Sequence, residues 1–199
     1  MSGILPAVCS IVLASASPRR RELLAQLVPN FEVVVAPVDE EALTVADPWA
    51  TAEGLALAKA RAVAISRPDA LVIGGDTVVA FEAETSFVQL AKPRDAADAQ
   101  RMLRELSGRS HVVITGVALV SADGERSFAE TTTVTFRDLS EDEIAAYVAT
   151  GEPMDKAGAY AIQGDAAGFV VEVDGSWSNV VGLPVERLRE ALGPRAGEG

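Results

Sequence analysis

Three consecutive arginines, Arg19, Arg20 and Arg21, follow a Ser-Pro step near the start of the chain. Ser17 followed by proline is typical of a helix start, so the arginines fall on the first helical turn, where cations oppose the helix dipole. A sequence that keeps positive charge where the helix dipole opposes it indicates a use for that charge, and we interpret the arginines as an anion site. Phosphate is the anion that suits them, because a forked guanidinium group can donate to two phosphate oxygens. The alternative is a solvated basic patch, paired with Glu22 or with acids elsewhere.

An aspartate follows two glycines at what we expect to be the end of a buried strand. Residues 70–73 are apolar, and Gly74, Gly75 and Asp76 come next. Glycine lets other groups approach the backbone closely, and a carboxylate in such a place commonly binds Mg²⁺ or acts as a general base. An ordinary turn with a capping aspartate is equally compatible with these residues.

Two lysines could add contacts to phosphate groups. Lys92 precedes a proline that fixes the backbone, and Lys59 lies on a long alanine-rich helix pattern. Considered alone, each is more commonly an ordinary surface lysine.

A glycine-rich region near the C-terminus, residues 155–164 and 175–184, surrounds a few polar groups with small residues. The amide of Gln163 offers both a donor and an acceptor, which suits the edge of a nucleobase. The alternative is a tightly packed loop between strands. We interpret Tyr160 and Trp177 as core or interface residues rather than base-stacking platforms.

Other reactive residue types give no site. His111 begins an apolar strand and is interpreted as structural, and Cys9 has no activating partner near it in sequence. Cys9 is also the only cysteine, so no intrachain disulfide can form, and the scatter of His and Cys excludes a structural zinc cluster.

Composition sets the class of protein. The 199 residues carry a net charge of −12, so non-specific binding to nucleic acid or to an anionic membrane is not expected. No apolar run is long enough to span a bilayer, and we expect no signal peptide and a cytoplasmic location. The length allows one domain, or two small lobes that share a core.

Strand and helix patterns alternate along the chain, which predicts an α/β fold with a mixed sheet because a hairpin accompanies the crossover helices. The predicted strands are 11–14, 31–35, 70–73, 111–121, 127–136 and 169–173, with a turn at 122–124 between the fourth and fifth. The predicted helices are 18–27, 48–65, 95–106, 140–150 and 184–192. The tail from Gly193 to Gly199 is expected to be flexible.

Five segments together resemble the Maf family of nucleoside triphosphate pyrophosphatases, from about Ile11 to Leu188. They read "LASASPRRRELL", "GGDTVV", "KPRDAADAQRMLRELSG", "YVATGEPMDKAGAYAIQG" and "VVGLP". One departure is Ala91, where relatives often carry glycine before Lys92.

The resemblance implies hydrolysis of a nucleoside triphosphate between its α and β phosphates, with a divalent cation, Mg²⁺ or Mn²⁺. It also implies a single domain over residues 1–199, with an elongated mixed sheet, flanking helices and a central cleft between two lobes, as in the inosine triphosphatase group. Homodimers are frequent in the family. The nucleotide substrate is the partner that this predicts.

The resemblance also implies a substrate branch. Arg19, Thr77 and Gln163 match the branch that acts on dTTP and UTP, whereas the 7-methyl-GTP branch tends to have Trp, Gln and Glu at these places. A neutral glutamine suits a uracil-type edge, and a glutamate would suit a cationic methylated guanine.

The roles implied for individual residues describe an electropositive pocket that holds a metal-bound triphosphate. Asp76 would be catalytic and a metal ligand, and Glu40 is the favoured second ligand among Asp39, Glu40 and Glu41. Phosphate binding would fall to Ser15, Arg19, Arg20, Lys59 and Lys92.

Three alternatives stay open from the sequence. The substrate could be 7-methyl-GTP or a modified pyrimidine triphosphate. The chain could be a nucleotide-binding regulator of cell division with little turnover. It could also be a nucleotidyltransferase, because basic loops and a carboxylate at a strand end suit that reaction too.

Overall fold

The computed structural model of the chain describes residues 10–193. Cys9 and the predicted flexible tail beyond Gly193 therefore lie outside the described residues. The strands are β1 (Ser10–Ala14), β2 (Glu32–Val33), β3 (Ala70–Ala83), β4 (Ser86–Leu90), β5 (Ser110–Ser121), β6 (Gly124–Phe136) and β7 (Val170–Asp174). The α-helices are α1 (Pro18–Ala25), α2 (Glu40–Leu43), α3 (Pro48–Ala64), α4 (Ala96–Leu106), α5 (Glu141–Ala149), α6 (Trp177–Val181) and α7 (Val185–Leu192). Three short 3₁₀ helices are η1 (Glu152–Asp155), η2 (Ala157–Ala159) and η3 (Asp165–Phe169).

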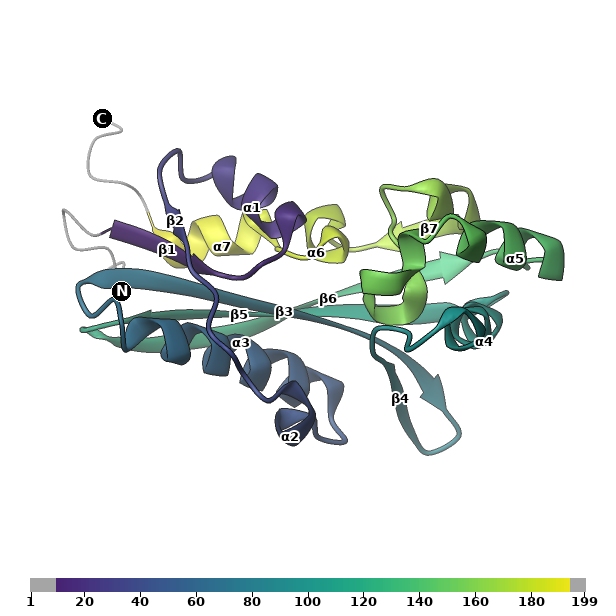
Figure 1. The fold of residues 1–199 in the computed structure, drawn as a ribbon, viewed down its shortest axis with the longest axis horizontal. Helices are drawn as coiled ribbons and strands as arrows, with labels where there is room; N and C mark the ends of the chain where they lie inside the picture. Colours follow the sequence, from purple (N-terminus) through teal and green to yellow (C-terminus); the bar gives the residue numbers. More distant parts are fainter. Residues whose placement is uncertain (1–9, 194–199) are drawn as a thin grey trace.

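These strands form one mixed sheet in the order β2-β1-β3-β5-β6-β7, with β4 also paired to β3. The pairs of β1 with β2 and with β3 are parallel, and the others are antiparallel. β3, β5 and β6 run along the elongated molecule (Figure 1). The mixed α/β fold expected from the alternating patterns is confirmed.

One edge of β3 is left open in its middle. β1 pairs with β3 as far as Gly74, and β4 begins to pair with it at Val79. Both neighbours lie on the edge opposite β5, which pairs with β3 without interruption from Val72 to Ala80. Residues 75–78 therefore have a strand neighbour on one side only.

The helices cover the two faces of the sheet unequally. α3 lies along one face, and α1, α6 and α7 lie on the other face near one end of the molecule, with α4 and α5 near the other end (Figure 1). Small side chains let α3 approach: a Cβ on Gly74 would lie 2.1 Å from the carbonyl oxygen of Ala56, and one on Gly116 would lie 2.1 Å from that of Ala52. Glycine at these two positions is what permits the close packing of α3 on the sheet.

The expected strand end at Gly74 is wrong, because β3 continues through Asp76 to Ala83. The glycines mark the close approach of α3 on one face and of the Arg20 side chain at Gly75 on the other, rather than a turn. The predicted strand 31–35 is also shorter than expected and is reduced to Glu32–Val33. The sequence patterns missed β4, α2 and α6, whose short lengths give little periodicity.

The start signals of the longer helices are confirmed. Ser17 caps α1 by accepting a hydrogen bond from the amide of Arg20, and Asp95 caps α4 in the same way from Asp98. Ser140 and Glu143 form a reciprocal capping box at the start of α5. The local residues alone therefore locate these helix starts.

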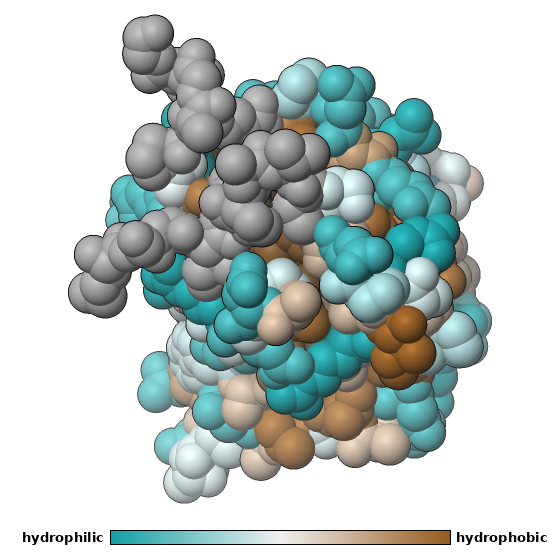
Figure 2. Space-filling model, turned by 90° about the vertical axis from the view of Figure 1, so that its left-hand side faces the viewer, coloured by the Kyte–Doolittle hydropathy of each residue, from teal (hydrophilic) through white to brown (hydrophobic). Residues whose placement is uncertain are grey.

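On the part of the surface that Figure 2 colours by hydropathy, hydrophilic and hydrophobic residues are interspersed. Trp177 is 49% exposed, which excludes the core alternative of its core-or-interface interpretation, whereas Tyr160 is buried. Within residues 10–193, no helix is long and apolar enough to cross a membrane.

His111 is a buried structural residue, as the sequence predicts. Its Nε2 lies 2.8 Å from the hydroxyl of Tyr160, and its ring packs edge-on against Phe136. Burial lowers the pKa of His111 to about 3 from its ordinary value of 6.5. The folded protein therefore keeps this ring neutral, whereas the unfolded chain takes up a proton below about pH 6.5.

The unfolding free energy is accordingly expected to fall by about 2 kcal/mol between about pH 7 and pH 5, because only the unfolded state gains this proton. Chemical denaturation at both pH values measures the loss, and the His111→Phe variant should flatten it. Asp98, whose pKa is lowered to about 2 by its hydrogen bond with Arg101, loses its contribution only below about pH 4. An equal loss in His111→Phe would contradict the assignment.

Candidate active site

A cleft of about 800 Å³ opens at the unpaired edge of β3. The residues proposed from the sequence for chemistry, binding and specificity all line it. They are Ser15, Arg19, Arg20, Glu40, Lys59, Asp76, Thr77, Lys92 and Gln163. The fold thus gathers into one cavity residues that are up to 148 positions apart, from Ser15 to Gln163.

Arg20 is fixed from three sides at the start of α1. Its Nε donates to the carbonyl oxygen of Gly182 at 2.8 Å, its Nη1 to Ser15 Oγ at 3.2 Å, and its Nη2 to Thr77 Oγ1 at 2.8 Å. Burial lowers the pKa of Arg20, and the charges of Asp76 and Glu40 oppose that effect. An arginine stays protonated in such surroundings, so the site holds a rigid, permanent positive charge.

The Asp76 side chain lies on the face of β3 that packs against α3, opposite to the face that Arg20 approaches. Lys59 Nζ lies 2.6 Å from Asp76 Oδ1 and 2.6 Å from Glu40 Oε1. The side chains of Lys59 and Asp76 are largely buried, at 17% and 13% exposure. The close packing of α3 on Gly74 is what brings Lys59 within reach of this carboxylate.

The three acids after β2 have different surroundings. Asp39 caps α2 by accepting from the amide of Ala42 at 3.1 Å, and Glu40 is the one that meets Lys59. Partial burial acts to raise the pKa of Glu40, but the hydrogen bond and charge of Lys59 and the charges of Lys92 and Arg20 outweigh it and lower that pKa. Glu40 is therefore held ionised beside Asp76.

These carboxylates could hold a divalent cation only together with ligands from outside the chain. No group of three or more His, Cys, Asp or Glu side chains among residues 10–193 is placed to hold a metal. Glu40 and Asp76 nevertheless converge on one cation, the ammonium of Lys59. Two carboxylates completed by phosphate oxygens and water are a donor set that fits Mg²⁺.

Lys92 and Gln163 also line the cleft. Lys92 follows β4, and the carbonyl oxygen of the preceding Ala91 accepts from the amide of Gly158 at 3.2 Å. Gln163 is exposed on a turn closed by Gly164, whose amide donates to the carbonyl oxygen of Ala161 at 3.1 Å. The polar amide of Gln163 is thus free to meet a ligand in the cleft.

Gly164 and Glu152 fix the turn that carries Gln163. A Cβ on Gly164 would lie 2.0 Å from Glu152 Oε1, so a carboxylate occupies that space. Tyr147 donates to the same oxygen at 3.0 Å, and the amide of Asp165 donates to Glu152 Oε2 at 3.3 Å. The segment expected as a packed loop is thereby held in short 3₁₀ turns.

Sequence reasoning assigned no role to Asp155 and Lys156, which also line the cleft and form an ion pair with each other. Lys156 Nζ also donates to the carbonyl oxygen of Glu152 at 3.1 Å. Both residues lie within the "MDKAG" stretch, but an adjacent acid and base give no signal that distinguishes them from a surface pair. Arg21, by contrast, is exposed and is not part of the lining.

The cleft predicted to be electropositive contains charges of both signs. Five basic and four acidic side chains line it, within a chain of net charge −12. Glu40 and Asp76 meet Lys59 of α3, and Arg20 approaches β3 from the other face. Such an arrangement can hold an anion on one side and a cation on the other.

Comparisons with known proteins point to one family. The model of the Maf-like protein family matches residues 10–194. The dTTP/UTP pyrophosphatase of Symbiobacterium thermophilum is 51% identical over 182 residues, covering 92% of each chain. The dTTP/UTP pyrophosphatase of Moorella thermoacetica is 53% identical over 184 residues, covering 92% of this chain and 93% of the relative.

Solved structures of more distant proteins also match. The Staphylococcus aureus Ham1 protein aligns with 79% of this chain and 89% of its own, at 18% identity and a TM-score of 0.47. A HAM1 protein from Coxiella burnetii aligns with 91% of this chain and 96% of its own, at 18% identity and a TM-score of 0.48.

Proposed function

This chain belongs to the Maf-like protein family, and on that premise we propose that it hydrolyses dTTP and UTP to the nucleoside monophosphate and pyrophosphate. The observation that supports the proposal most is the convergence of Asp76, Arg20 and Lys92 on one cleft at the open edge of β3.

Because β3, β5 and β6 extend through both ends of the sheet, we propose that the two groups of helices belong to one domain.

Hydrolysis of a phosphoanhydride depends chiefly on positioning and on the stabilisation of phosphate charge. We assign the triphosphate to Arg19, Arg20, Lys59 and Lys92, with Ser15 and the amides at the start of α1 as further donors. Asp76 orients a water molecule and accepts its proton as the water oxygen bonds to phosphorus. The P–O bond of the α–β anhydride then breaks and pyrophosphate leaves.

Asp76 and Glu40 are the residues that would hold a divalent cation, Mg²⁺ or Mn²⁺. When bound, such an ion neutralises phosphate charge and lowers the pKa of a coordinated water molecule. Lys59 bridges the same two carboxylates and keeps them oriented toward one point. Its ammonium lies 2.6 Å from Asp76 Oδ1, so Lys59 would share this carboxylate with a bound dication.

We assign the selection of the base to Arg19 and Gln163, whereas Thr77, which the sequence placed with them, contacts Arg20. Gln163 provides a donor and an acceptor on the exposed turn, which suits the paired polar atoms of a uracil or thymine edge. Arg19 lines the cleft at the start of α1, and its charge acts on Asp155 across the cleft.

A panel of nucleotides with detection of pyrophosphate tests the proposed function. The panel comprises dTTP, UTP, pseudouridine triphosphate, 7-methyl-GTP and ATP, each with Mg²⁺, with Mn²⁺ and with a chelator. We expect pyrophosphate from dTTP and UTP in the presence of either cation. Release of orthophosphate instead, a requirement for an acceptor molecule, or tight binding of UTP without any product would contradict the proposal.

Replacement of Gln163 by glutamate is expected to lower kcat/KM for UTP and dTTP by about tenfold, because a carboxylate has no donor for a base carbonyl. The same change is expected to raise the relative use of 7-methyl-GTP, whose base is cationic. Steady-state kinetics on the three nucleotides measure the ratio. Equal loss on all three would mean that Gln163 does not contact the base.

A further inference from the structure

Arg20 stands at the head of a chain of side-chain hydrogen bonds that enters the protein interior. Arg20 Nη2 lies 2.8 Å from Thr77 Oγ1, and Thr77 Oγ1 lies 3.0 Å from Thr115 Oγ1. Thr115 in turn donates to the backbone carbonyl oxygen of Asn179 at 3.0 Å. Thr77 and Thr115 are directly opposite each other on β3 and β5. This series of hydrogen bonds thus links α1, β3, β5 and α6.

The types of the groups fix which one donates and which one accepts in each hydrogen bond from Arg20 to Asn179. A carbonyl oxygen only accepts, so the single hydroxyl proton of Thr115 is donated to Asn179. The contact between the two threonines therefore requires Thr77 as donor. Thr77 then accepts from Arg20, because a guanidinium only donates. The hydroxyl proton of Thr77 is consequently not available to a ligand.

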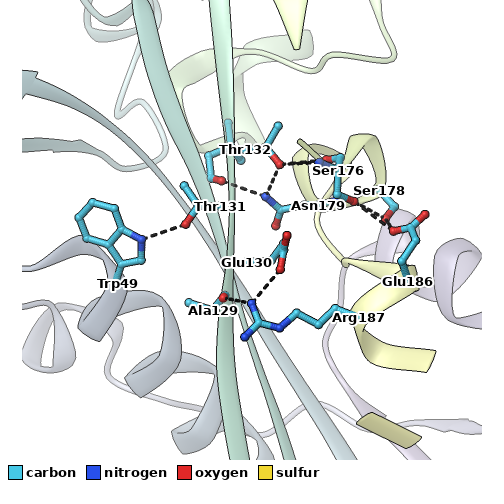
Figure 3. A network of polar contacts seen from close by, with 11 residues as sticks. Trp49, Ala129, Glu130, Thr131, Thr132, Ser176, Ser178, Asn179, Glu186 and Arg187 are labelled. Atoms are coloured by element: carbon cyan, nitrogen blue, oxygen red, sulfur yellow. Dashed lines mark hydrogen bonds and ion pairs between the residues drawn. The ribbon is translucent and has the colours of Figure 1, made fainter. Parts of the chain in front are cut away.

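The interior end of this series of hydrogen bonds, at Asn179, is held by further contacts. Asn179 is fully buried, and its Nδ2 donates to the carbonyl oxygen of Val113 at 3.0 Å and to Thr132 Oγ1 at 2.9 Å. Thr132 also donates to the carbonyl oxygen of Ser176 at 3.1 Å, so the start of α6 is held against β6 (Figure 3). The other end of α6 presents Gly182, whose carbonyl oxygen accepts from Arg20 Nε.

We propose that Thr115 is a positioning residue for the reaction, and that Thr77 affects the substrate by holding Arg20 rather than by donating to the base. The inference rests on the proposed function, because Arg20 is taken to bind the triphosphate. Of the five N–H groups of Arg20, three are used by Gly182, Ser15 and Thr77. One N–H on Nη1 and one on Nη2 are left for phosphate oxygens. The Thr115 hydroxyl, which is 0% exposed and cannot touch the substrate, sets their direction through Thr77.

Thr115→Val removes this hydroxyl with little change of shape. We expect kcat/KM for UTP to fall by about tenfold, the scale of one lost hydrogen bond, and Thr115→Ser to keep it within about threefold of the wild type. Thr135→Val is the control, since it removes another threonine hydroxyl that bridges two strands, 2.8 Å from Ser110 Oγ on β5, but lies outside the cleft. It should leave kcat/KM within about twofold.

A double-mutant cycle with Arg20→Ala decides whether Thr115 acts through Arg20. We expect Thr115→Val to have no further effect on kcat/KM when Arg20 is already alanine. Effects that multiply, or an equal loss in Thr135→Val, would overturn the proposal while leaving the activity itself established.

An inactive wild-type protein would be a failure of the proposed function instead. The same cycle is then measured as the dissociation constant for UTP. If the effects of Thr115→Val and Arg20→Ala on that dissociation constant multiply, the role of Thr115 is overturned. If Thr115→Val leaves the dissociation constant of the Arg20→Ala protein unchanged, the role is supported.

Discussion

Replacement of Asp76 by asparagine is expected to lower kcat by about 10²–10⁴-fold and to leave the affinity for nucleotide within a few-fold of the wild type. Asparagine has almost the shape of aspartate but cannot accept a proton from water. It also removes one of the two carboxylates that converge on the Lys59 ammonium. The measurements are pyrophosphate release under saturating UTP and equilibrium binding of UTP.

Glu82→Gln provides the control for this result. Glu82 lies on the same strand as Asp76, six residues further on, and is exposed outside the cleft. The control variant loses the same charge and should keep the wild-type kcat. If Asp76→Asn retained more than about a tenth of the wild-type kcat, a value far above that expected without a general base, Asp76 would not be the catalytic carboxylate.

Replacement of Gly74 by alanine is expected to destabilise the fold by about 3 kcal/mol, because the added methyl group has no space. Its Cβ would lie 2.1 Å from the carbonyl oxygen of Ala56 and 3.0 Å from the backbone nitrogen of Ala60. Both are backbone atoms of α3, so the helix must move away from β3. Lys59 lies on this helix and would move with it, so kcat should fall together with stability.

Gly54→Ala is the matched control on the same helix. No atom lies within 4 Å of a Cβ at Gly54, so alanine there should raise stability by up to about 1 kcal/mol through its higher helix propensity. Urea denaturation of both variants measures the two changes. An unchanged unfolding midpoint for Gly74→Ala would show that α3 does not pack on β3 as closely as the structure has it.

Local signals in the sequence are enough to predict much of the fold. Helix starts at Ser17, Asp95 and Ser140 each depend on one side chain bonding to the next turn, and such contacts need no tertiary information. The two-residue turn between β5 and β6 is equally local. Short elements such as α2 and β4 were missed because four or five residues contain too little pattern.

Residue types predicted which side chains line the cleft, but not where the cleft lies in the fold. Two glycines before Asp76 indicated a strand end, whereas the strand continues and its neighbours end instead. Glycine in a sequence signals that something approaches the backbone, and it does not say whether that is a turn, a helix or a side chain. Here α3 approaches at Gly74 and Arg20 approaches at Gly75.

The sequence by itself determined which groups this protein has for chemistry: guanidinium and ammonium groups for phosphate, carboxylates for a cation or a water molecule, and an amide for a base. Those are properties of side chains and of the short motifs that carry them. Only the tertiary structure decided their partners. It paired Lys59 with both Glu40 and Asp76, and it joined Thr77 to Thr115 and Arg20. These contacts depend on strand pairing and on the packing of α3, which bring together residues that are far apart along the chain.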